Sequence, residues 1–457
     1  MENSTSLSTH TQTPKNEIPG PRGMELYSLG TLIKNRPLET FRFLHQTWGD
    51  MVLAPWWNRE TIFVNNPDAF RYILKTNHTN YTKSYEYKYL RPLLGRGLVT
   101  SEGKEWRKNR QIMSQEFHMK RVEKFLPSME KLTEEMLTKW REREDKTFDI
   151  SEEMMALTFK IAGIAFFGDS IEQYTQVAKE SLEIEVHRAA QKINSMLPIP
   201  DSIPTAANRQ GQKAISNLEK IIFTLMGNYR KKAGGEPNIL SRLMDYRDEN
   251  AAGLPPKQIR DELMTLMLAG HETTSNALTW TFYYLAEHPE YQEKIFQEIR
   301  RLEGKENFTP EKLENYPMLN ACLYESMRLS PPVPGVSRSN VEDDVLNGYF
   351  IPAGSTIVCS IHAIHRDARY WNNPSAFKPE RFIGREQKAD DYTYLPFAKG
   401  PRACIGERMA MLEAQIILLK IIKNYRFELV EGFRPQPEHS ITLRSRNGLK
   451  MKMHARG

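Results

Sequence analysis

The ten-residue stretch Phe397-Ala398-Lys399-Gly400-Pro401-Arg402-Ala403-Cys404-Ile405-Gly406 places one cysteine in a glycine-bearing loop, directly ahead of an amphipathic helix predicted at Met409–Tyr425. Free backbone N–H groups and the helix dipole at such a position stabilise a thiolate, the form of cysteine that binds soft metal ions. Gly400 and Gly406 allow sharp turns that bring backbone amides close to the sulfur. A single cysteine in a turn is more often a buried structural residue. The rest of the sequence has to decide between these interpretations.

The overall composition is that of a large folded protein. The chain has 457 residues, of which 40% are hydrophobic, and this excludes a fibrous or disordered class. The formal net charge is +6, from 63 basic and 57 acidic residues. This is a mixed surface rather than a polycation, so no nucleic-acid partner is expected.

Cysteine content and hydropathy bear on the location of the protein. Cys322, Cys359 and Cys404 are an odd number at wide spacings without a CxxC pair. Neither a disulfide framework nor a cysteine-rich zinc site is therefore expected, and a reducing, cytoplasmic location is the simpler interpretation. The N-terminal segment is polar, and no apolar run approaches the roughly 20 residues that span a bilayer, so the sequence predicts no secretion signal and no transmembrane anchor.

The longest predicted helix lies between Pro256 and Pro289, because proline suits a first helical turn and also ends a helical run. At ~1.5 Å per residue it is roughly 45 to 50 Å long, enough to cross the whole body of a domain. Gly270 and the hydroxyl groups of Thr273 and Thr274 weaken its middle. A local distortion of the helix is predicted there.

The remaining local signals predict a mainly α-helical fold with a small β-rich lobe. The other predicted elements are two strands at Met51–Leu53 and Thr61–Val64, a helix at Pro317–Leu329, a hairpin turn at Asn347-Gly348 and a buried strand at Ser355–Ile361. No repeat or low-complexity linker divides the chain. We therefore expect residues 1–18 to be a disordered tail and residues 19–457 to form a single domain.

The cysteine loop as a whole resembles the haem-binding loop of the cytochrome P450 family, in its soluble prokaryotic-type members. The pattern is long and specific, and four separated motifs follow the family's order along the chain. The resemblance implies that Cys404 is the axial thiolate ligand of the iron in haem b (iron protoporphyrin IX), with Phe397 and Gly406 beside it. It also implies the cytochrome P450 fold, in which the haem lies between the long distal helix and the cysteine loop.

The segment Ala269-Gly270-His271-Glu272-Thr273-Thr274 is similar to the oxygen-activating part of the family's distal helix. Ala269 and Thr273 share one helix face, and the resemblance implies that Ala269 contacts the haem. A hydroxyl backed by a carboxylate can relay protons from water, so Thr273 and Glu272 are the implied catalytic residues. A zinc-protease HExxH motif fails here because Ser275 replaces its second histidine. A packing contact with a few polar residues is the alternative.

The resemblance also implies residues that hold the haem propionates. These are Trp106 and Arg110 in the segment EGKEWRKNR, Arg338 after the Pro331–Gly335 turn, and Arg402 in the cysteine loop. An arginine near an apolar turn is more often a surface residue, which is the alternative for Arg338.

Glu325 and Arg328 form an i, i+3 pair, which in isolation is usually a solvated surface pair worth only a few tenths of a kcal/mol. Together with the segment Phe377–Phe382, the pair is similar to the family's network of one glutamate and two arginines. The resemblance implies Arg381 as the third member. Such a cluster is structural, and burial is tolerable only when it is fully hydrogen-bonded.

The implied activity is that of a haem-thiolate monooxygenase, which inserts one oxygen atom from O2 into its substrate. The chain has no glycine-rich dinucleotide loop and no flavin or iron–sulfur segment. Electrons are therefore expected from a separate ferredoxin or flavodoxin with its NAD(P)H reductase. Basic residues expected on the docking side, unless they are ordinary surface charge, are Lys104, Arg107, Lys108, Lys120, Arg121, Lys399 and Arg408.

The segments expected to line the substrate pocket indicate only a broad class of substrate. By analogy, the segments expected to line the pocket are Tyr81–Leu98, Met196–Ile199, Met267–Thr273 and Val333–Val336. They are largely apolar, which favours a lipophilic substrate such as a fatty acid, terpenoid or carotenoid. Two alternatives remain for the activity: a peroxide-driven haem peroxygenase, which needs no electron donor, and a non-catalytic haem sensor or electron carrier.

Overall fold

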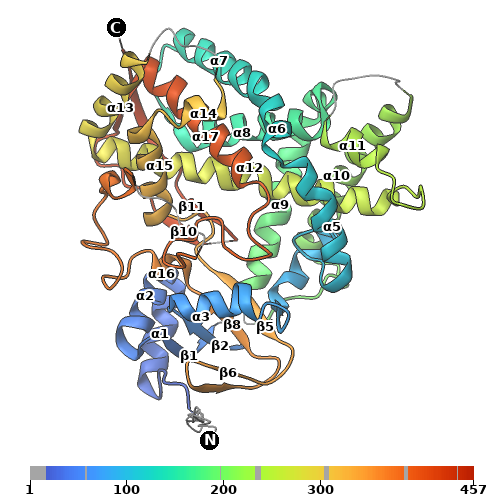
Figure 1. The fold of residues 1–457 in the computed structure, drawn as a ribbon, viewed down its shortest axis with the longest axis vertical. Helices are drawn as coiled ribbons and strands as arrows, with labels where there is room; N and C mark the ends of the chain where they lie inside the picture. The colour runs from blue at the N-terminus through green and yellow to red at the C-terminus, as the bar shows by residue number, and fades with distance from the viewer. Residues whose placement is uncertain are drawn as a thin grey trace, which may run out of the picture.

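The computed structural model describes residues 17–56, 59–195, 197–231, 238–302, 308–384, 390–439 and 441–456. Residues 1–16 of the predicted tail and Met196 of the predicted pocket lining lie outside the described residues. Helices dominate this part of the chain and strands are few (Figure 1).

The α-helices are α1 (Met24–Asn35), α2 (Pro37–Trp48), α3 (Pro67–Arg71), α4 (Arg91–Leu94), α5 (Gly103–Glu116), α6 (Met119–Val122), α7 (Leu126–Glu142), α8 (Ile150–Phe167), α9 (Thr175–Ile193), α10 (Ala206–Lys231), α11 (Ile239–Asp245), α12 (Pro256–Glu287), α13 (Pro289–Arg301), α14 (Pro310–Leu313), α15 (Pro317–Leu329), α16 (Ile361–Ile364) and α17 (Glu407–Asn424). Shorter helical turns are η1 (Tyr72–Thr76), η2 (Tyr85–Tyr89), η3 (Glu123–Phe125), η4 (Asp169–Tyr174) and η5 (Pro379–Phe382).

The strands are β1 (Met51–Trp56), β2 (Arg59–Val64), β3 (Tyr81–Lys83), β4 (Thr147–Asp149), β5 (Val336–Asn340), β6 (Asp344–Leu346), β7 (Tyr349–Ile351), β8 (Thr356–Cys359), β9 (Tyr425–Leu429), β10 (Pro437–His439), β11 (Leu443–Ser445) and β12 (Lys450–Ala455). They form a five-stranded sheet in the order β1-β2-β8-β5-β3, a three-stranded sheet in the order β4-β12-β9, and the two-stranded pairs β6-β7 and β10-β11.

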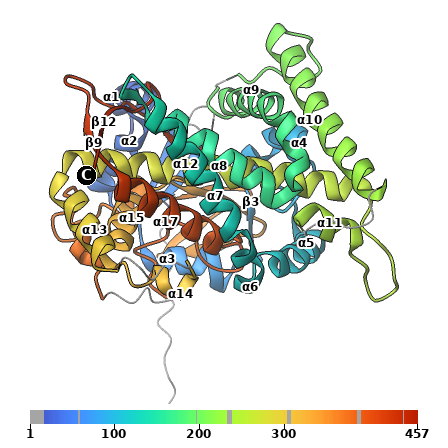
Figure 2. The same cartoon turned by 90° about the horizontal axis from the view of Figure 1, so that it is seen from above.

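Helix α12 is the 32-residue element around which the helical body is built, and it crosses the molecule in both views (Figures 1 and 2). It packs against α8, α15 and α17. Its bounds agree with the prediction from Pro256 and Pro289. The helix continues through Gly270, and the local distortion expected there stays a prediction. The glycine permits close packing, because a Cβ atom there would lie 2.9 Å from the ring of Phe166 on α8.

The five-stranded sheet forms the β-rich lobe, together with α1 and α2 at the lower end of Figure 1. Successive side chains of a strand point to opposite faces. Accordingly, Ile62 and Val64 of β2 join one apolar cluster, whereas Phe63 joins a second cluster with residues of α1 and α2. Strand β8 pairs with both β2 and β5, and three of its four side chains are buried, which agrees with the buried strand predicted at Ser355–Ile361.

Two further local predictions agree with the structure. Asn347 and Gly348, with φ angles of 50° and 80°, connect β6 and β7 as a tight hairpin. Helix α17 begins at Glu407, directly after the cysteine loop and two residues before the predicted start at Met409. The loop therefore leads into a helix N-terminus, as the sequence indicates.

Among the described residues, no helix is both long enough and apolar enough to cross a membrane.

Candidate functional site

The cysteine loop is a tight backbone structure ahead of α17. The Cys404 N–H donates to the Phe397 carbonyl at 2.9 Å, and the Ala403 N–H donates to the Gly400 carbonyl at 3.0 Å. Gly400 has a φ of 82°, and a Cβ atom there would lie 2.0 Å from the Leu74 carbonyl oxygen. Only glycine meets both demands. Gly406 differs, because its φ is −89° and a Cβ atom would meet Phe117 at an ordinary 3.8 Å.

The Cys404 sulfur has a mixed electrostatic environment. The Cys404 side chain is exposed. The surrounding protein nevertheless desolvates the thiol and raises its pKa to about 11. The N–H groups of Gly406 and Glu407 and the charge of Arg110 act in the opposite direction. The helix N-terminus thus favours the thiolate, as the sequence suggests, but burial outweighs it in the protein alone. Binding a metal ion would displace the proton.

A cluster of cations gathers on the same side as the cysteine loop. Arg110 on α5 donates to the Ala403 carbonyl at 2.8 Å. Arg402 forms an ion pair with Glu102, and its guanidinium lies 4.2 Å from the centre of the Trp106 ring. Arg338 on β5 is 5% exposed, and its positive charge lowers the pKa of the neighbouring Arg402, whose pKa is lowered first by burial.

Lys83 is a fourth cation of this cluster, and sequence reasoning missed it. Its ammonium group donates to the carbonyls of Leu98 at 2.9 Å and Ser101 at 3.3 Å. Burial, followed by the charge of Arg402, lowers the pKa of Lys83 to about 7. A lysine at the end of a short strand carries no sequence signal of this kind, since its neighbours come from distant segments.

On α12, the predicted catalytic pair occupies adjacent positions with different surroundings. The Thr273 hydroxyl donates to the Ala269 carbonyl at 2.8 Å. Glu272 is 6% exposed and accepts a hydrogen bond from the Thr442 hydroxyl at 2.7 Å. Asn276 in turn donates to the Thr442 hydroxyl at 3.2 Å. Burial raises the pKa of Glu272, opposed by Thr442, and a raised pKa suits a group that has to give up a proton near neutral pH.

A cavity of about 300 Å³ lies beside this pair, and Ala269, Glu272 and Thr273 all line it. Three of the four predicted lining segments contribute to it, namely those around Tyr85–Leu90, Leu268–Thr273 and Val333–Gly335. The segment Met196–Ile199 does not contribute through its described residues. Leu197 and Ile199 are instead 87% and 51% exposed, and α9 supplies Ile193 while Asn194 follows it.

The β-rich lobe and the β10-β11 hairpin supply lining residues that the sequence did not indicate. Phe41, Phe63, His439 and Thr442 come from segments far from α12 in the sequence. We call this space, bounded by α12, η2 and the β-rich lobe, the distal cavity.

Glu325, Arg328 and Arg381 come together in the structure. Arg328 donates twice to Glu325, at 2.7 and 2.9 Å, and both side chains are fully buried. Its other bonds go to the carbonyls of His365, Pro374 and Ala376. Arg381 donates to Glu325 at 3.2 Å. Since every N–H of the Arg328 guanidinium and its Nε has an acceptor, the burial of this charge is compensated.

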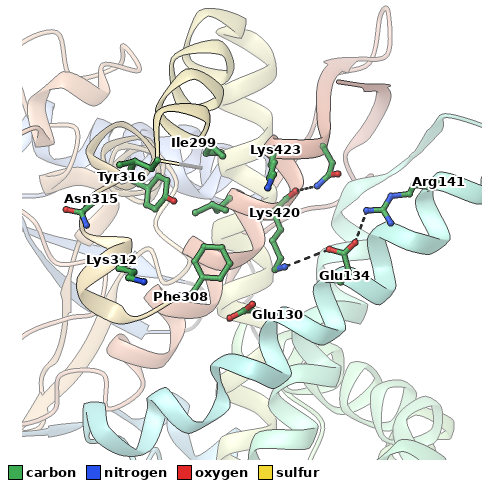
Figure 3. Close-up of a pocket in the computed structure, with 13 residues that line it drawn as sticks. Glu130, Glu134, Arg141, Ile299, Phe308, Lys312, Asn315, Tyr316, Lys420 and Lys423 are labelled. Carbon is green, nitrogen blue, oxygen red and sulfur yellow. Dashed lines mark hydrogen bonds and ion pairs between the residues drawn. The ribbon is translucent and has the colours of Figure 1, made fainter. Parts of the chain in front are cut away.

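A second, larger cleft is unrelated to the predicted residues. It has a volume of about 480 Å³ and is lined by residues of α7, α13, α14 and α17 (Figure 3). Glu134 there pairs with Arg141 at 2.7 Å and with Lys420 at 3.8 Å. Its lining combines paired surface charges with Phe308 and Ile299, and it contains none of the predicted site residues.

Comparison with known proteins defines the class of this fold and site. The family model described as Cytochrome P450 matches residues 14–453. The chain therefore belongs to the cytochrome P450 family of monooxygenases. It is 30% identical over 480 residues to Cytochrome P450 4d1 of Drosophila melanogaster, covering 96% of this chain and 93% of that protein. It is 28% identical over 428 residues to cyclooctatin synthase of Streptomyces melanosporofaciens, covering 92% and 93%.

Solved structures confirm the predicted fold class. The cytochrome P450DA haem domain superposes with a TM-score of 0.86 at 23% identity, over 98% of this chain and 99% of that one. The retinoic acid-bound cyanobacterial CYP120A1 superposes with a TM-score of 0.84 at 25% identity, over 96% and 99%.

Membership of the family implies a haem cofactor, and the residues present fit one. Cys404 offers a soft sulfur donor that small molecules can reach. The cation cluster of Lys83, Arg110, Arg338 and Arg402 suits the two carboxylates of a haem. The buried Arg402 Nε has no hydrogen-bond partner among the described residues, so an anionic acceptor would satisfy it.

Proposed function

We propose that this protein inserts one oxygen atom from O2 into a lipophilic substrate, with Cys404 as the haem ligand and electrons from a separate redox partner. One observation carries the proposal: Thr273 and the buried acid Glu272 line the same largely apolar cavity. A hydroxyl and a carboxyl beside an apolar space are what oxygen activation next to a C–H bond requires.

When bound, a thiolate-ligated haem supplies the electron transfer and the activation of dioxygen. Arg110, Arg338, Arg402 and Trp106 would hold its propionate side, where Lys83 adds a further positive charge. Phe397 and Gly406 would flank the sulfur, the first through the backbone bond to Cys404. The Ala269 side chain is a single methyl group, which could allow a flat group to approach α12, and it is exposed on a largely buried stretch of the helix.

Thr273 and Glu272 would move protons. The Thr273 hydroxyl donates to the Ala269 carbonyl, so its oxygen can accept a hydrogen bond from water. Once turned away from that carbonyl, the hydroxyl would give its own proton towards the reacting oxygen and take a proton from the water in return. Glu272, whose pKa is raised by burial, would supply that proton and take another from solvent. Thr442 and Asn276 are positioning residues that fix the orientation of the Glu272 carboxyl.

The electron donor would bind over α5 and the start of α17. Helix α5 is attached to the cysteine loop through Arg110, and Lys104, Arg107 and Lys108 are exposed on it. Lys120 and Arg408 add exposed positive charge nearby, which suits an acidic ferredoxin or flavodoxin. Of the other predicted members, Arg121 is paired with Glu116 and Lys399 is half-buried. A cytoplasmic location fits this supply of electrons and the absence of disulfides between the described cysteines.

The experiment that tests the proposal uses the haem-loaded protein, ferredoxin, its reductase and NADPH under isotopically labelled dioxygen. Lipophilic compounds of several classes that shift the ferric haem to high spin serve as substrates. We expect products that carry one labelled oxygen atom and depend on the electron donor. Faster turnover with hydrogen peroxide alone would instead support the peroxygenase alternative. A protein that binds dioxygen after reduction but oxidises none of the compounds that bind would support the sensor or carrier alternative.

A further inference from the structure

We propose that Glu86 recognises the polar end of the substrate, so that the distal cavity selects lipophilic molecules carrying a neutral hydrogen-bond donor such as a hydroxyl group and disfavours free carboxylates. The inference rests on the proposed function, because it takes the distal cavity as the substrate site. It narrows the substrate class from lipophilic molecules in general to lipophilic alcohols and excludes unesterified fatty acids.

Glu86 lines the distal cavity and carries a buried oxygen atom that lacks a hydrogen-bond donor among the described residues. The residue lies in η2, and this atom is its Oε2. Burial raises the pKa of this carboxyl, while the Ser84 hydroxyl, its own backbone amide and Arg59 act in the opposite direction. A buried acceptor without a donor is unfavourable. Rotation of the carboxyl group would turn Oε2 towards the cavity, where a ligand hydroxyl that donates to it removes that penalty.

The charge around the cavity is acidic. Glu86 and Glu272 both line it, and its described lining includes neither lysine nor arginine. His439 also lines it, but burial lowers the pKa of this imidazole to about 4, so it is neutral near pH 7. Arg59, the cation whose charge lowers the pKa of Glu86, does not line the cavity and lies 3.8 Å from the centre of the Tyr85 ring. A ligand carboxylate would therefore enter a space with two carboxyl groups and no counter-ion.

Glu272 and Glu86 have different roles in the distal cavity. Glu272 already accepts a hydrogen bond from Thr442, and it belongs to the proton relay on α12. Glu86 lies on a separate element, η2, so a ligand held there leaves another part of its skeleton to face Thr273. The surfaces between them include the apolar side chains of Leu90, Val99, Leu268 and Val333. Glu86 would thus fix which carbon atoms reach the oxidising centre.

The test measures binding of three matched ligands to the haem-loaded protein by calorimetry: dodecan-1-ol, its methyl ether and dodecanoate. We expect the alcohol to bind about tenfold more tightly than the ether, which cannot donate, and dodecanoate to bind most weakly. Glu86→Leu removes the acceptor and should abolish the preference for the alcohol. Glu86→Gln keeps an acceptor but removes the charge, so it should retain much of that preference and bind dodecanoate better than the wild type does.

The matched control is Glu60→Gln, which changes an exposed carboxylate on β2, the strand that also carries the cavity residue Phe63. It should leave all three affinities unchanged. The proposal fails if the wild type binds dodecanoate as tightly as the alcohol, if it binds none of the three, or if a folded Glu86→Leu keeps the preference. Should Glu86→Leu not fold, an unchanged dodecanoate affinity in Glu86→Gln is sufficient to reject it. Because calorimetry needs no turnover, a protein that shows these preferences without incorporating labelled oxygen would contradict only the proposed function.

Discussion

At the residue scale, a few side chains of α12 stand out from the helix around them. Ala269 is exposed and Thr273 is half-buried, whereas Leu268, His271 and Thr274 are all buried. The exposed surfaces of Ala269 and Thr273 coincide with the distal cavity, which both residues line. A hydroxyl that is accessible from a cavity on a buried helix can exchange hydrogen bonds with water or a ligand. The same hydroxyl packed in the core cannot.

Thr273→Ala should uncouple oxygen consumption from product formation. Without the hydroxyl, protons reach the reacting oxygen less selectively, so more of the reducing power should appear as hydrogen peroxide. We expect the fraction of NADPH converted to product to fall by about tenfold or more. The measurement is the ratio of product and peroxide to NADPH consumed.

Two variants are matched controls for Thr273→Ala. Thr273→Ser keeps the hydroxyl and should retain most of the coupling. Thr279→Val removes a buried hydroxyl that bonds to the Ser275 carbonyl on the same helix, away from the cavity, and should leave coupling unchanged. Equal coupling in Thr273→Ala and the wild type would contradict the relay.

The sequence could indicate Cys404, Glu272 and Thr273 because each lies in a short contiguous pattern. It could not indicate Thr442, which meets Glu272 across 170 residues of sequence, nor Glu86, whose role depends on which groups fail to reach its buried oxygen. Contacts of that kind are set by tertiary packing and leave no local pattern.

At the element scale, the same i, i+3 spacing gives two very different ion pairs. Arg328 and Glu325 on α15 are fully buried, whereas Arg36 and Glu39 near the start of α2 are 66% and 57% exposed. The buried pair connects α15 with η5 through Arg381 and with the segment after α16 through His365. The buried pair therefore connects several elements of the fold, whereas the exposed pair connects none.

Arg328→Leu should lower the free energy of unfolding by about 3 to 5 kcal/mol, because it leaves the Glu325 charge buried without its main partner. Arg36→Leu should change it by no more than about 1 kcal/mol, since water screens the exposed pair. Denaturant unfolding of both variants in the haem-loaded protein provides the comparison. Similar losses in the two variants would show that the buried network does not have the structural role assigned to it.

Element bounds were predictable wherever proline or a turn signal marks them. Helix α15 begins and ends as expected, at Pro317 and Leu329, and α12 follows its flanking prolines. Helix propensity describes Gly270 in isolation, whereas in the structure the ring of Phe166 packs against this position and α12 continues through it. Tertiary contact can override such a local preference.

At the scale of the whole molecule, the β-rich lobe and the helical body both contribute to the distal cavity, since Phe63 and Thr273 line the same space. The prediction that residues 19–457 form a single domain stays a prediction. Ile18 packs against an apolar cluster of the β-rich lobe, and Glu17 pairs with Arg22 at 2.8 Å, so contacts with the folded body begin close to the predicted boundary.

Charge reversal on the proposed docking side should slow electron delivery. Lys108→Glu and Arg408→Glu each replace an exposed cation with an anion, and we expect reduction by an acidic ferredoxin to slow several-fold at low ionic strength, with a smaller effect at high salt. Lys213→Glu makes the same change on the exposed side of α10 and should have no such effect. Stopped-flow reduction would measure this, and equal slowing in all three variants would argue against a localised docking surface.

The contribution of the buried histidines to stability should fall as the pH is lowered from 6.5 towards 4. Burial lowers the pKa values of His45, His271 and His439 to about 4, so in this window these histidines bind more protons in the unfolded chain than in the folded one. Buried carboxyl groups act in the opposite direction, since burial raises the pKa of Glu262 to about 7 and also raises the pKa values of Glu86, Glu272, Glu298, Glu407 and Glu413. The test therefore isolates one histidine. His45→Gln should therefore lose less thermal stability between pH 7 and 5 than the wild type, unlike a substitution of the exposed His118. Identical losses in wild type and His45→Gln would contradict this.

The identity of the axial ligand is tested most directly by the absorption spectrum of the reduced protein with carbon monoxide. The wild type should show the strongly red-shifted Soret band of thiolate ligation. Cys404→Ser should abolish that band, while Cys322→Ser and Cys359→Ser, which change buried cysteines elsewhere, should keep it. A red-shifted band that persists in Cys404→Ser, or one that is lost in Cys359→Ser, would contradict the assignment of Cys404 as the haem ligand.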